Sequence, residues 1–294
     1  MNVAVFASPA SWHFRDLVRA AGGAHQLVAV DYENLSATVG AAGDEVRCGD
    51  TVLTECDAAL VRSMPPGGLE PVVFRMNALA RLDAAGVPVI NPPRAIEAAI
   101  DKYLTTARLA AAGLTVPATA ACQRIDDALE AFDRLGGDVV VKPLFGGEGR
   151  GLVRITDRVL AARAFASLTR FGSVVYLQKF VPHDGRDWRL LVVGDDVWGM
   201  QRRNPDDWRT NISCGGVGEP LEATPALADL ARRAAAAVGA SVAGVDFLPG
   251  SDGELYALEV NASPGWRALA EVTGVDVAAR VLDHVERAAR SACS

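Results

Sequence analysis

The feature of this sequence that most constrains its fold is a strand–turn–strand pattern near the C-terminal end, at residues 242–265. Side chains of a strand alternate between its two faces, so Glu259 and Asn261 point the same way. Turn-forming residues at 249–253 join this run to an earlier one that contains Asp246, and the two runs are expected to pair as a hairpin. The hairpin would gather two carboxylates and an amide, hard oxygen ligands that suit Mg²⁺ or Mn²⁺. Taken alone, these residues fit an edge strand with polar side chains facing water equally well.

Composition narrows the class of protein. The 294 residues, 50% of them hydrophobic, allow one large core or two to three smaller ones, at roughly 100–200 residues per domain. The formal net charge of −7 argues against a general nucleic-acid binder, which needs a basic surface to displace counterions from phosphate. No apolar run reaches the ~18 residues of a membrane span, and no basic region precedes the first apolar run. We therefore expect a cytoplasmic protein that binds neither nucleic acid nor membrane.

The cysteines predict no crosslink and no zinc site. They are odd in number and lack CxxC spacing, so we expect ordinary reduced thiols. They are Cys48, Cys56, Cys122, Cys214 and Cys293.

Lysine is rare in this chain. Only Lys102, Lys142 and Lys179 occur among the 29 basic residues, and the rest are arginines. A slim, flexible point charge suits phosphate binding, so these lysines are candidate phosphate ligands. Chance could also leave three lysines at these places.

Strand-like and helical runs alternate over the first 90 or so residues, which is typical of a parallel sheet with helices on its faces. A dinucleotide-binding domain shows the same alternation, but no GxGxxG follows the first apolar run. Arg62 comes directly after an apolar strand, where open parallel sheets face their ligand crevice, and is a candidate substrate contact. A solvated strand end explains Arg62 equally well. The prolines at 92–93 mark the end of a first domain, residues 1–93.

Helical and strand-like runs also alternate in the second third of the chain, residues 94–178. A helix is predicted at 94–113 and carries Lys102. A strand at 116–122 and a helix at 125–137 follow, and the helix has Asp126 as its expected N-terminal cap and Gly136 as its stop. The next strand, 138–145, carries Lys142.

A glycine-rich segment, GGEGRG at residues 146–151, comes next. It is no Walker A loop, because a strand pattern follows in place of GK, a hydroxyl residue and a helix. We expect the glycines to join two strands as a flexible flap whose backbone N–H groups, at Gly147, Gly149 and Gly151, can cover phosphates. A plain glycine-rich turn is the alternative, and Lys142 on the preceding strand favours the flap.

The last third, residues 179–294, begins at a short connector between domains, a frequent place for an adenine ring to bind. A hairpin is predicted at 187–203 with its turn at 194–196, followed by a long polar loop, 204–222, that contains Arg209 and Asn211. Long loops inside compact domains are commonly functional. A capped helix from Thr224 leads to the C-terminal hairpin, and an amphipathic helix ends the chain.

Together these segments resemble one known family, the ATP-grasp superfamily and in particular the branch of the ribosomal S6 glutamate ligase. The resemblance covers essentially the full length and implies an α/β fold in which an N-terminal parallel-sheet domain precedes two ATP-grasp lobes of α+β type. The matching segments, in the order of that family, are DK at 101–102, VVKP at 140–143, the flap, LQKFV at 177–181, DWRLLVVGD at 187–195, RR at 202–203, WRTN at 208–211, GVDFL at 244–248 and EVNASPG at 259–265.

The resemblance also implies roles for single residues. Lys102 and Lys142 would hold the phosphates of ATP. The linker residues that would receive the adenine, with Asp187 nearby, are Gln178, Lys179, Phe180 and Val181.

The remaining implied roles concern the reacting groups. Arg209 and Asn211 would reach the phosphates or the acyl group, and Arg203 would contact the substrate and steady developing negative charge. The expected ligands of two Mg²⁺ or Mn²⁺ ions are Asp246, Glu259 and Asn261.

The sequence departs from that family in two places. Lys179 stands where the linker usually has Glu, which puts side-chain contacts to adenine in doubt. Residues 212–214, Ile-Ser-Cys, replace the basic or imidazole residues of ligases that act on S6, which puts a protein acceptor in doubt.

The chemistry implied is amide formation through an acyl phosphate, because an amine cannot displace a carboxylate oxygen directly. Catalysis would be positioning and charge neutralisation, which explains a site of cations and glycines with no obvious nucleophile. We expect an ATP-dependent ligase that adds L-glutamate to a small-molecule carboxylate acceptor, and residues 62–79 resemble relatives acting on pterin- or furan-type carriers. A protein C-terminus as acceptor, a regulatory module without turnover, and a nicotinamide oxidoreductase are the alternatives. We also expect a homo-oligomer, since relatives often form one.

Overall fold

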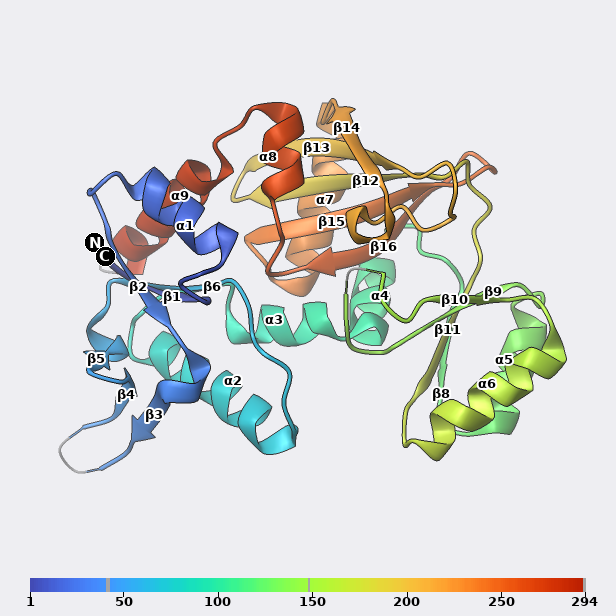
Figure 1. Cartoon of the computed structure of the whole chain (residues 1–294), viewed down its shortest axis with the longest axis horizontal. Helices are drawn as coiled ribbons and strands as arrows, with labels where there is room; N and C mark the ends of the chain where they lie inside the picture. The colour runs from blue at the N-terminus through green and yellow to red at the C-terminus, as the bar shows by residue number, and fades with distance from the viewer. Residues whose placement is uncertain (41–42, 148, 293–294) are drawn as a thin grey trace.

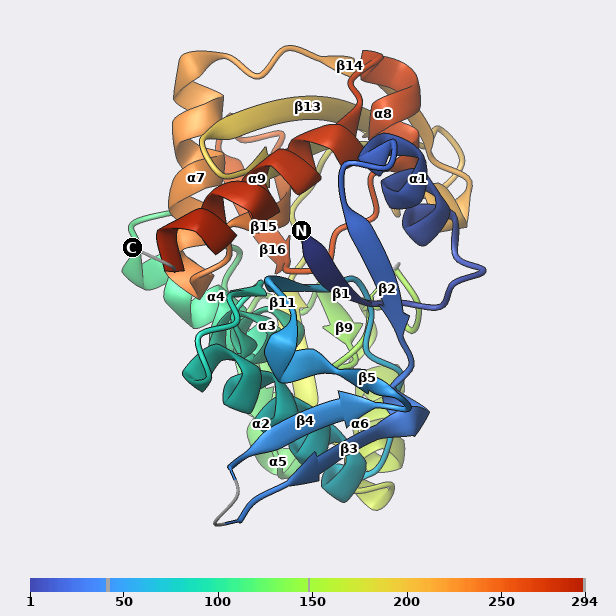
Figure 2. The same cartoon turned by 90° about the vertical axis from the view of Figure 1, so that its left-hand side faces the viewer.

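A computed structural model describes residues 1–40, 43–147 and 149–292 and shows four sheets (Figures 1 and 2). The mixed architecture agrees with the predicted fold class: a parallel sheet in the N-terminal region and antiparallel sheets in the two regions that follow. None of the helices in the described part of the chain combines the length and the hydropathy that a membrane span requires. Cysteines 48, 56, 122 and 214 are free, and Cys293 lies outside the described residues.

The N-terminal region contains a parallel sheet in the order β2-β1-β6-β7 and a small antiparallel sheet, β3-β4-β5. Strand β6 is buried on both faces, as expected for a parallel strand covered by helices. The elements are β1 Asn2–Phe6, α1 Trp12–Ala21, β2 Gln26–Val30, β3 Leu35–Thr38, β4 Glu45–Cys48, β5 Thr51–Val52, β6 Ala58–Val61, α2 Leu69–Ala84 and β7 Val89–Ile90.

The central region is a four-stranded antiparallel sheet, β10-β9-β11-β8, with α5 and α6 on one face (Figure 1). Its buried residues form a core of their own, built around Phe132, Phe165 and Leu177. Helices α3 and α4 precede it in sequence but pack against β16 and α7 of the C-terminal region. The elements are α3 Pro93–Ile100, α4 Lys102–Ala111, β8 Thr119–Cys122, α5 Ile125–Arg134, β9 Val139–Lys142, β10 Val153–Ile155, α6 Arg158–Arg170 and β11 Val175–Lys179.

Two predictions about helix boundaries in this region were wrong. The single helix expected at 94–113 is two helices that meet at Asp101, whose carboxylate accepts hydrogen bonds from the amides of Tyr103 and Leu104 and caps α4. Asp126 does not cap α5, because the helix begins at Ile125 and Asp126 lies in its first turn. A carboxylate there still favours the helix by its interaction with the positive end of the helix dipole.

The C-terminal region is a five-stranded antiparallel sheet, β14-β13-β12-β15-β16. Alternate residues of its strands point to two cores: Leu190 and Val192 pack with α7, and Leu191 and Val193 pack with α8 and α9. The elements are β12 Arg186–Val193, β13 Asp196–Arg203, β14 Val217–Leu221, α7 Pro225–Val238, β15 Val242–Pro249, β16 Leu255–Asn261, α8 Arg267–Thr273 and α9 Val277–Ala292.

The N-terminal and C-terminal regions share cores and are joined by the buried side chain of Asn91. Its amide donates to the carbonyls of Val242 and Ala262, at 2.7 and 2.6 Å, and its oxygen accepts from the amides of Ser241 and Val242. Helix α9 also contacts both α1 and β6, and Figure 2 shows it crossing between the two sheets. The end of β6 is thereby held against the C-terminal end of β16.

Candidate active site

The predicted C-terminal hairpin is present as β15 and β16. Asp246 and Glu259 are direct cross-strand partners, and a register shift follows between Asp246 and Phe247. Asn261 pairs with Gly244 and lies two residues from Glu259, on the same face. The three oxygen-bearing side chains predicted from the sequence therefore lie on one face of the sheet, on its last two strands.

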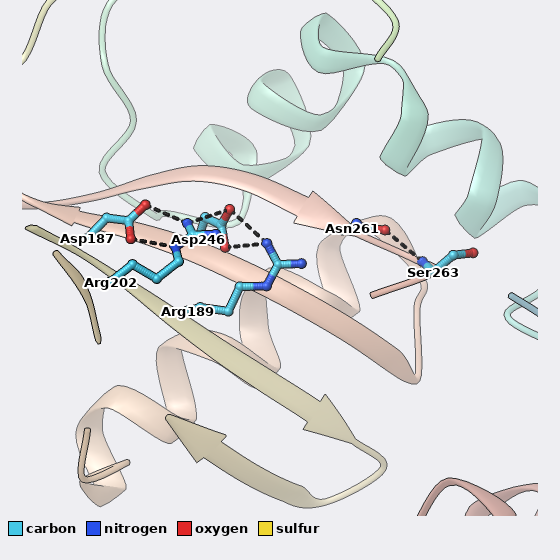
Figure 3. A network of polar contacts seen from close by, with 6 residues as sticks. All are labelled: Asp187, Arg189, Arg202, Asp246, Asn261 and Ser263. Atoms are coloured by element: carbon cyan, nitrogen blue, oxygen red, sulfur yellow. Dashed lines mark hydrogen bonds and ion pairs between the residues drawn. The ribbon is translucent and has the colours of Figure 1, made fainter. Parts of the chain in front are cut away.

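The carboxylate of Asp246 is enclosed by two arginines (Figure 3). Nη1 of Arg189 donates to both oxygens, at 2.9 and 3.0 Å, and Nη2 of Arg202 lies 3.0 Å from Oδ2. Gly244 leaves room for this, since a Cβ there would lie 2.7 Å from Arg189 Nη2. Burial alone would raise the pKa of Asp246, but the two guanidinium groups hold it below its ordinary value. Asp246 is therefore a buried carboxylate that stays charged.

Arg202 also binds the carboxylate of Asp187, with Nε 2.7 Å from Oδ1. Only 4% of Arg202 and 4% of Asp187 is exposed. The pKa of Arg202 is lowered by burial but raised more by Asp246 and Asp187 together. Strands β12, β13 and β15 thus carry a charge network whose members neutralise one another, and it forms one wall of the site.

Two members of the predicted metal-ligand set, Glu259 and Asn261, are available to a divalent cation, whereas both oxygens of Asp246 already bind arginines. Glu259 makes no hydrogen bond or ion pair with any other described residue, so its oxygens are free for an ion. The Asn261 amide oxygen accepts from the Ser263 amide at 2.8 Å, which fixes its orientation and leaves a second lone pair. Among the described residues no three His, Cys, Asp or Glu side chains cluster, so the set is two carboxylates and an amide. Hard oxygen donors of this kind suit Mg²⁺ or Mn²⁺.

Two lysines approach these carboxylates from the central region. Lys142, at the end of β9, donates to the side-chain oxygen of Gln178 at 2.6 Å, and burial lowers its pKa to about 8, partly offset by Glu259. Lys102 opens α4, and its ammonium group donates to the carbonyl of Gly146 in the flap. Neither lysine forms an ion pair with a described carboxylate, so both charges are free to meet phosphate.

The flap joins β9 to β10 as an antiparallel hairpin, as predicted, although residue 148 lies outside the described residues. Gly149 has φ +72° and approaches the polar loop so closely that a Cβ would lie 2.5 Å from Oδ1 of Asn211. At Gly151 a Cβ would lie 2.8 Å from the ring of Pro143. These two positions therefore require glycine. The flap and the loop between β13 and β14 lie against each other and line the same part of the site.

The linker after β11 is held by the neighbouring strands. The amides of Lys179 and Phe180 donate to the carbonyls of Ala118 and Asp138, at 2.8 and 2.9 Å. The Phe180 ring lies 3.5 Å from the guanidinium of Arg154 and 6.0 Å from the ring of Trp208. The Lys179 side chain is exposed. Lysine in place of the usual glutamate therefore changes the solvent-facing border of the site, while the linker backbone keeps its hydrogen bonds.

The polar loop carries Arg209, whose Nε lies 3.0 Å from the Oδ2 atom of Asp207. Buried Asn204 organises the loop by donating to the carbonyls of Arg209 and Cys214. Arg209 and Asn211 therefore reach the site from one well-connected loop.

These elements line a pocket between the central and C-terminal regions. The predicted residues that line it are Lys102, Lys142, Gly147, Gly149, Gln178, Lys179, Phe180, Val181, Asp187, Arg209, Asn211, Asp246 and Glu259. Gly151 packs on Pro143 outside this pocket, whereas Asn261 and Arg62 line an adjoining cavity of about 590 Å³ that shares Arg202, Asn211, Asp246 and Glu259 with it. We call the first pocket, where we expect ATP, the nucleotide pocket and the adjoining cavity the basin.

The structure does not bring Arg203 to the site. Arg203 is exposed, whereas its neighbour Arg202 is buried in the charge network. A signal for this was present in the sequence. A two-residue turn at Gly194 and Asp195 sets the register of β12 and β13, which pairs Asp187 with Arg202 and Arg186 with Arg203. Arg189 was also missed, although it lies two residues from Asp187 on the same strand and so shares its face.

Comparison with known proteins identifies the family and the fold. Residues 99–285 match the RimK-like ATP-grasp domain family. A tetrahydromethanopterin:alpha-L-glutamate ligase of Methanosarcina acetivorans is 31% identical over 269 residues, 82% of this chain and 83% of the relative. The protein of that name from Methanococcus maripaludis is 41% identical over 203 residues, 67% of this chain and 68% of the relative. In fold, the chain resembles the ATP-grasp ligase PsnB, solved with a minimal precursor, Mg and ADP, with a TM-score of 0.76 at 23% identity, covering 98% of this chain and 97% of PsnB.

Proposed function

The chain belongs to the RimK-like ATP-grasp family, and from this premise we propose that it adds L-glutamate to the carboxyl group of a small-molecule acceptor at the expense of ATP. Two of its relatives carry the name tetrahydromethanopterin:alpha-L-glutamate ligase. The observation that carries the proposal is the convergence of Lys102, Lys142 and Glu259 on one pocket beside a buried arginine network.

The residues of the pocket suggest how the nucleotide binds. The adenine would lie against the linker at 178–181 and beneath Trp208, and the triphosphate would run toward Lys102 and Lys142. Two free ammonium groups and the flap amides suit a polyanion. The pKa of about 8 keeps Lys142 mostly protonated at neutral pH, ready to pair with phosphate.

The divalent ions would be held by Asp246, Glu259 and Asn261, and we propose two of them, Mg²⁺ or Mn²⁺. When bound, they would neutralise charge on the phosphates that are being transferred. We also propose a homo-oligomer that works in the cytoplasm, and sedimentation of the purified protein would show a mass of one chain if the oligomer is absent.

The chain's own side chains account for the rest of the reaction. Transfer of the γ-phosphate to the acceptor carboxyl makes a leaving group, and the amine of glutamate then displaces phosphate to form the amide. Arg202 and Arg189 lie beside the carboxylates where negative charge would develop on the acyl oxygen. Buried groups oriented by neighbouring strands need little reorganisation during the reaction.

The test is a ligation assay with purified protein, ATP, Mg²⁺, L-glutamate and a panel of pterin- and furan-type carboxylates. We expect release of ADP and phosphate, and a gain of one or more glutamyl units in the acceptor by mass spectrometry. Release of AMP and pyrophosphate would exclude the acyl phosphate. Nucleotide binding without turnover for every acceptor, including peptides with a free C-terminus, would instead support a regulatory module.

A further inference from the structure

The basin adjoins the nucleotide pocket at the metal-ligand set. Its polar wall is formed by His13 and Arg62 of the N-terminal region and by Arg189, Arg202, Asn261, Ser263 and Arg267 of the C-terminal region. Its volume of about 590 Å³ falls within the range of small-ligand sites. A ligand there would be next to Glu259 and Asp246, which line both cavities.

Three of the four arginines in the basin have a carboxylate partner from the chain. Arg189 and Arg202 bind Asp246, and Arg202 also binds Asp187. Arg267 forms a solvent-exposed ion pair with Glu271 on helix α8, at 3.0 Å. These cations are therefore neutralised before any substrate arrives.

Arg62 differs from the other three. It follows β6, only 7% of it is exposed, and it forms no ion pair with any described residue. Its guanidinium stacks 4.1 Å from the centre of the Trp266 ring and donates through Nη2 to the carbonyl of Pro264, while Nε has no hydrogen-bond partner. Burial lowers its pKa to about 9, so it remains charged at neutral pH.

The neighbours of Arg62 do not balance this charge. Burial first, and then the charge of Arg62, lower the pKa of His13 to about 4, so His13 is neutral. The ring of His13 is committed to the chain, because its Nε2 accepts from the amide of Trp266 at 3.3 Å. A buried charge without a counter-charge is costly, and a site that keeps one is suited to an anionic ligand.

A third cavity beside the metal-ligand set has a different lining. It shares Glu259, Asn261 and Ser263 with the basin but is lined by the apolar side chains of Val61, Met64, Ile96 and Ile100. That cavity suits the body of an apolar or aromatic acceptor. The basin, with its unbalanced cation, suits a small molecule whose recognition depends on charge.

We propose that Arg62 binds a free carboxylate of the incoming amino acid and so places the amine beside the carboxylates of β15 and β16. This inference rests on the proposed function and deepens it, because it assigns the amino acid to the basin. One guanidinium without a carboxylate partner among the described residues can pair with one of the two carboxylates of L-glutamate, neither of which is consumed in the reaction. Charge-assisted, bidentate pairing of this kind is the usual way proteins recognise carboxylates.

The experiment compares Arg62→Met with wild type in the ligation assay, with separate Michaelis constants for L-glutamate, ATP and the acceptor. Methionine keeps an apolar contact with Trp266 and removes the charge. We expect the KM for L-glutamate to rise about tenfold to a hundredfold, with the KM for ATP unchanged. Arg62→Lys keeps the charge but not the planar guanidinium, so its KM for L-glutamate should lie between those of wild type and Arg62→Met.

A matched control is Arg75→Met. Arg75 also donates to a carbonyl, of Pro65 at 2.8 Å, and also stacks on an aromatic ring, of Tyr32 at 5.5 Å, but it lines none of the three cavities described above. We expect the KM values of Arg75→Met for L-glutamate and ATP to match wild type. Thermal unfolding of each variant separates a loss of fold from a loss of recognition.

Amide analogues show which carboxylate Arg62 binds. L-Glutamine lacks the side-chain carboxylate and L-isoglutamine lacks the α-carboxylate. The analogue that lacks the bound group should be a poor substrate of wild type, and its KM should not rise further in Arg62→Met. If neither analogue behaves in this way, the inference is wrong.

The remaining outcomes separate the two proposals. An active Arg62→Met enzyme with the wild-type KM for L-glutamate, or with a raised KM for the acceptor in its place, overturns the assignment of Arg62 and leaves the ligase proposal standing. A wild-type protein that ligates no amino acid overturns the proposed function, and the assignment of Arg62 falls with it.

Discussion

The charges buried on the C-terminal sheet differ from those that the other two regions bring to the site. On the sheet, Arg189 and Arg202 are neutralised by Asp187 and Asp246 (Figure 3). The central region contributes Lys142 and the N-terminal region contributes Arg62, and neither has a carboxylate partner among the described residues. This difference indicates that the sheet network has a structural role. Lys142 and Arg62, in contrast, are positioned to bind anionic groups of the substrates.

Replacing Arg202 tests whether the network stabilises the fold, and we expect this substitution to reduce the stability more than any other considered below. Arg202→Met leaves Asp187 buried without a counter-charge, which should cost about 3–5 kcal/mol in the free energy of unfolding. Arg203→Met, one residue along the same strand but exposed, should change it by less than about 0.5 kcal/mol. Urea unfolding of both variants measures this. Equal losses in the free energy of unfolding would show that the network does not stabilise the fold.

Glu259 lines the nucleotide pocket, the basin and the third cavity with its apolar lining, so its negative charge acts on a ligand in any of them. Glu259→Gln keeps the shape and removes a carboxylate from the metal-ligand set. We expect the rate of ADP release to fall about a hundredfold or more. Glu254→Gln, at the exposed turn end of the same hairpin, is the control and should retain wild-type activity. Full activity in Glu259→Gln would remove Glu259 from the site.

The lowered pKa of Lys142 makes nucleotide affinity depend on pH. Burial favours the neutral amine and sets the pKa at about 8 in the free protein, whereas a bound triphosphate favours the ammonium form. Binding must then take up a proton above this pH, and the affinity for MgADP should fall about fivefold from pH 8 to pH 9. Titration calorimetry in two buffers of different ionisation enthalpy measures the uptake. Lys142→Arg should abolish it, and an unchanged pH dependence in that variant would assign it to another group.

Arg62 should contribute the least to stability, although it is buried nearly as deeply as Arg202. Arg62→Met removes a buried charge that has no partner, so we expect the free energy of unfolding to change by less than about 1 kcal/mol, or to rise. The same urea experiment measures it. A loss as large as that of Arg202→Met would mean that Arg62 is structural and that the contrast between the two regions does not hold.

Local patterns predicted much of the fold. Alternation of apolar residues indicated the hairpin of β15 and β16, and glycine with a following strand pattern indicated the flap between β9 and β10. The patterns failed at Asp101, which could lie inside one long helix or cap the start of a second helix. Asp101 interrupts an otherwise continuous helical run, and only its hydrogen bonds to two amides show that it starts a new helix.

The sequence by itself determined the chemistry of the site, because oxygen ligands, lysines and glycines can be recognised one by one from their type and spacing. The turn between β12 and β13 already pairs Asp187 with Arg202, but the tertiary structure alone decided that Asp246 joins them and that Arg62 has no carboxylate partner among the described residues. Asp187, Arg202 and Asp246 come from three strands that pair only in the folded sheet, and Arg62 reaches the basin only because Asn91 fixes β7 and its neighbour β6 against β15 and β16. Neutralisation depends on distances of a few ångströms between residues far apart in the chain, and no local pattern encodes such distances.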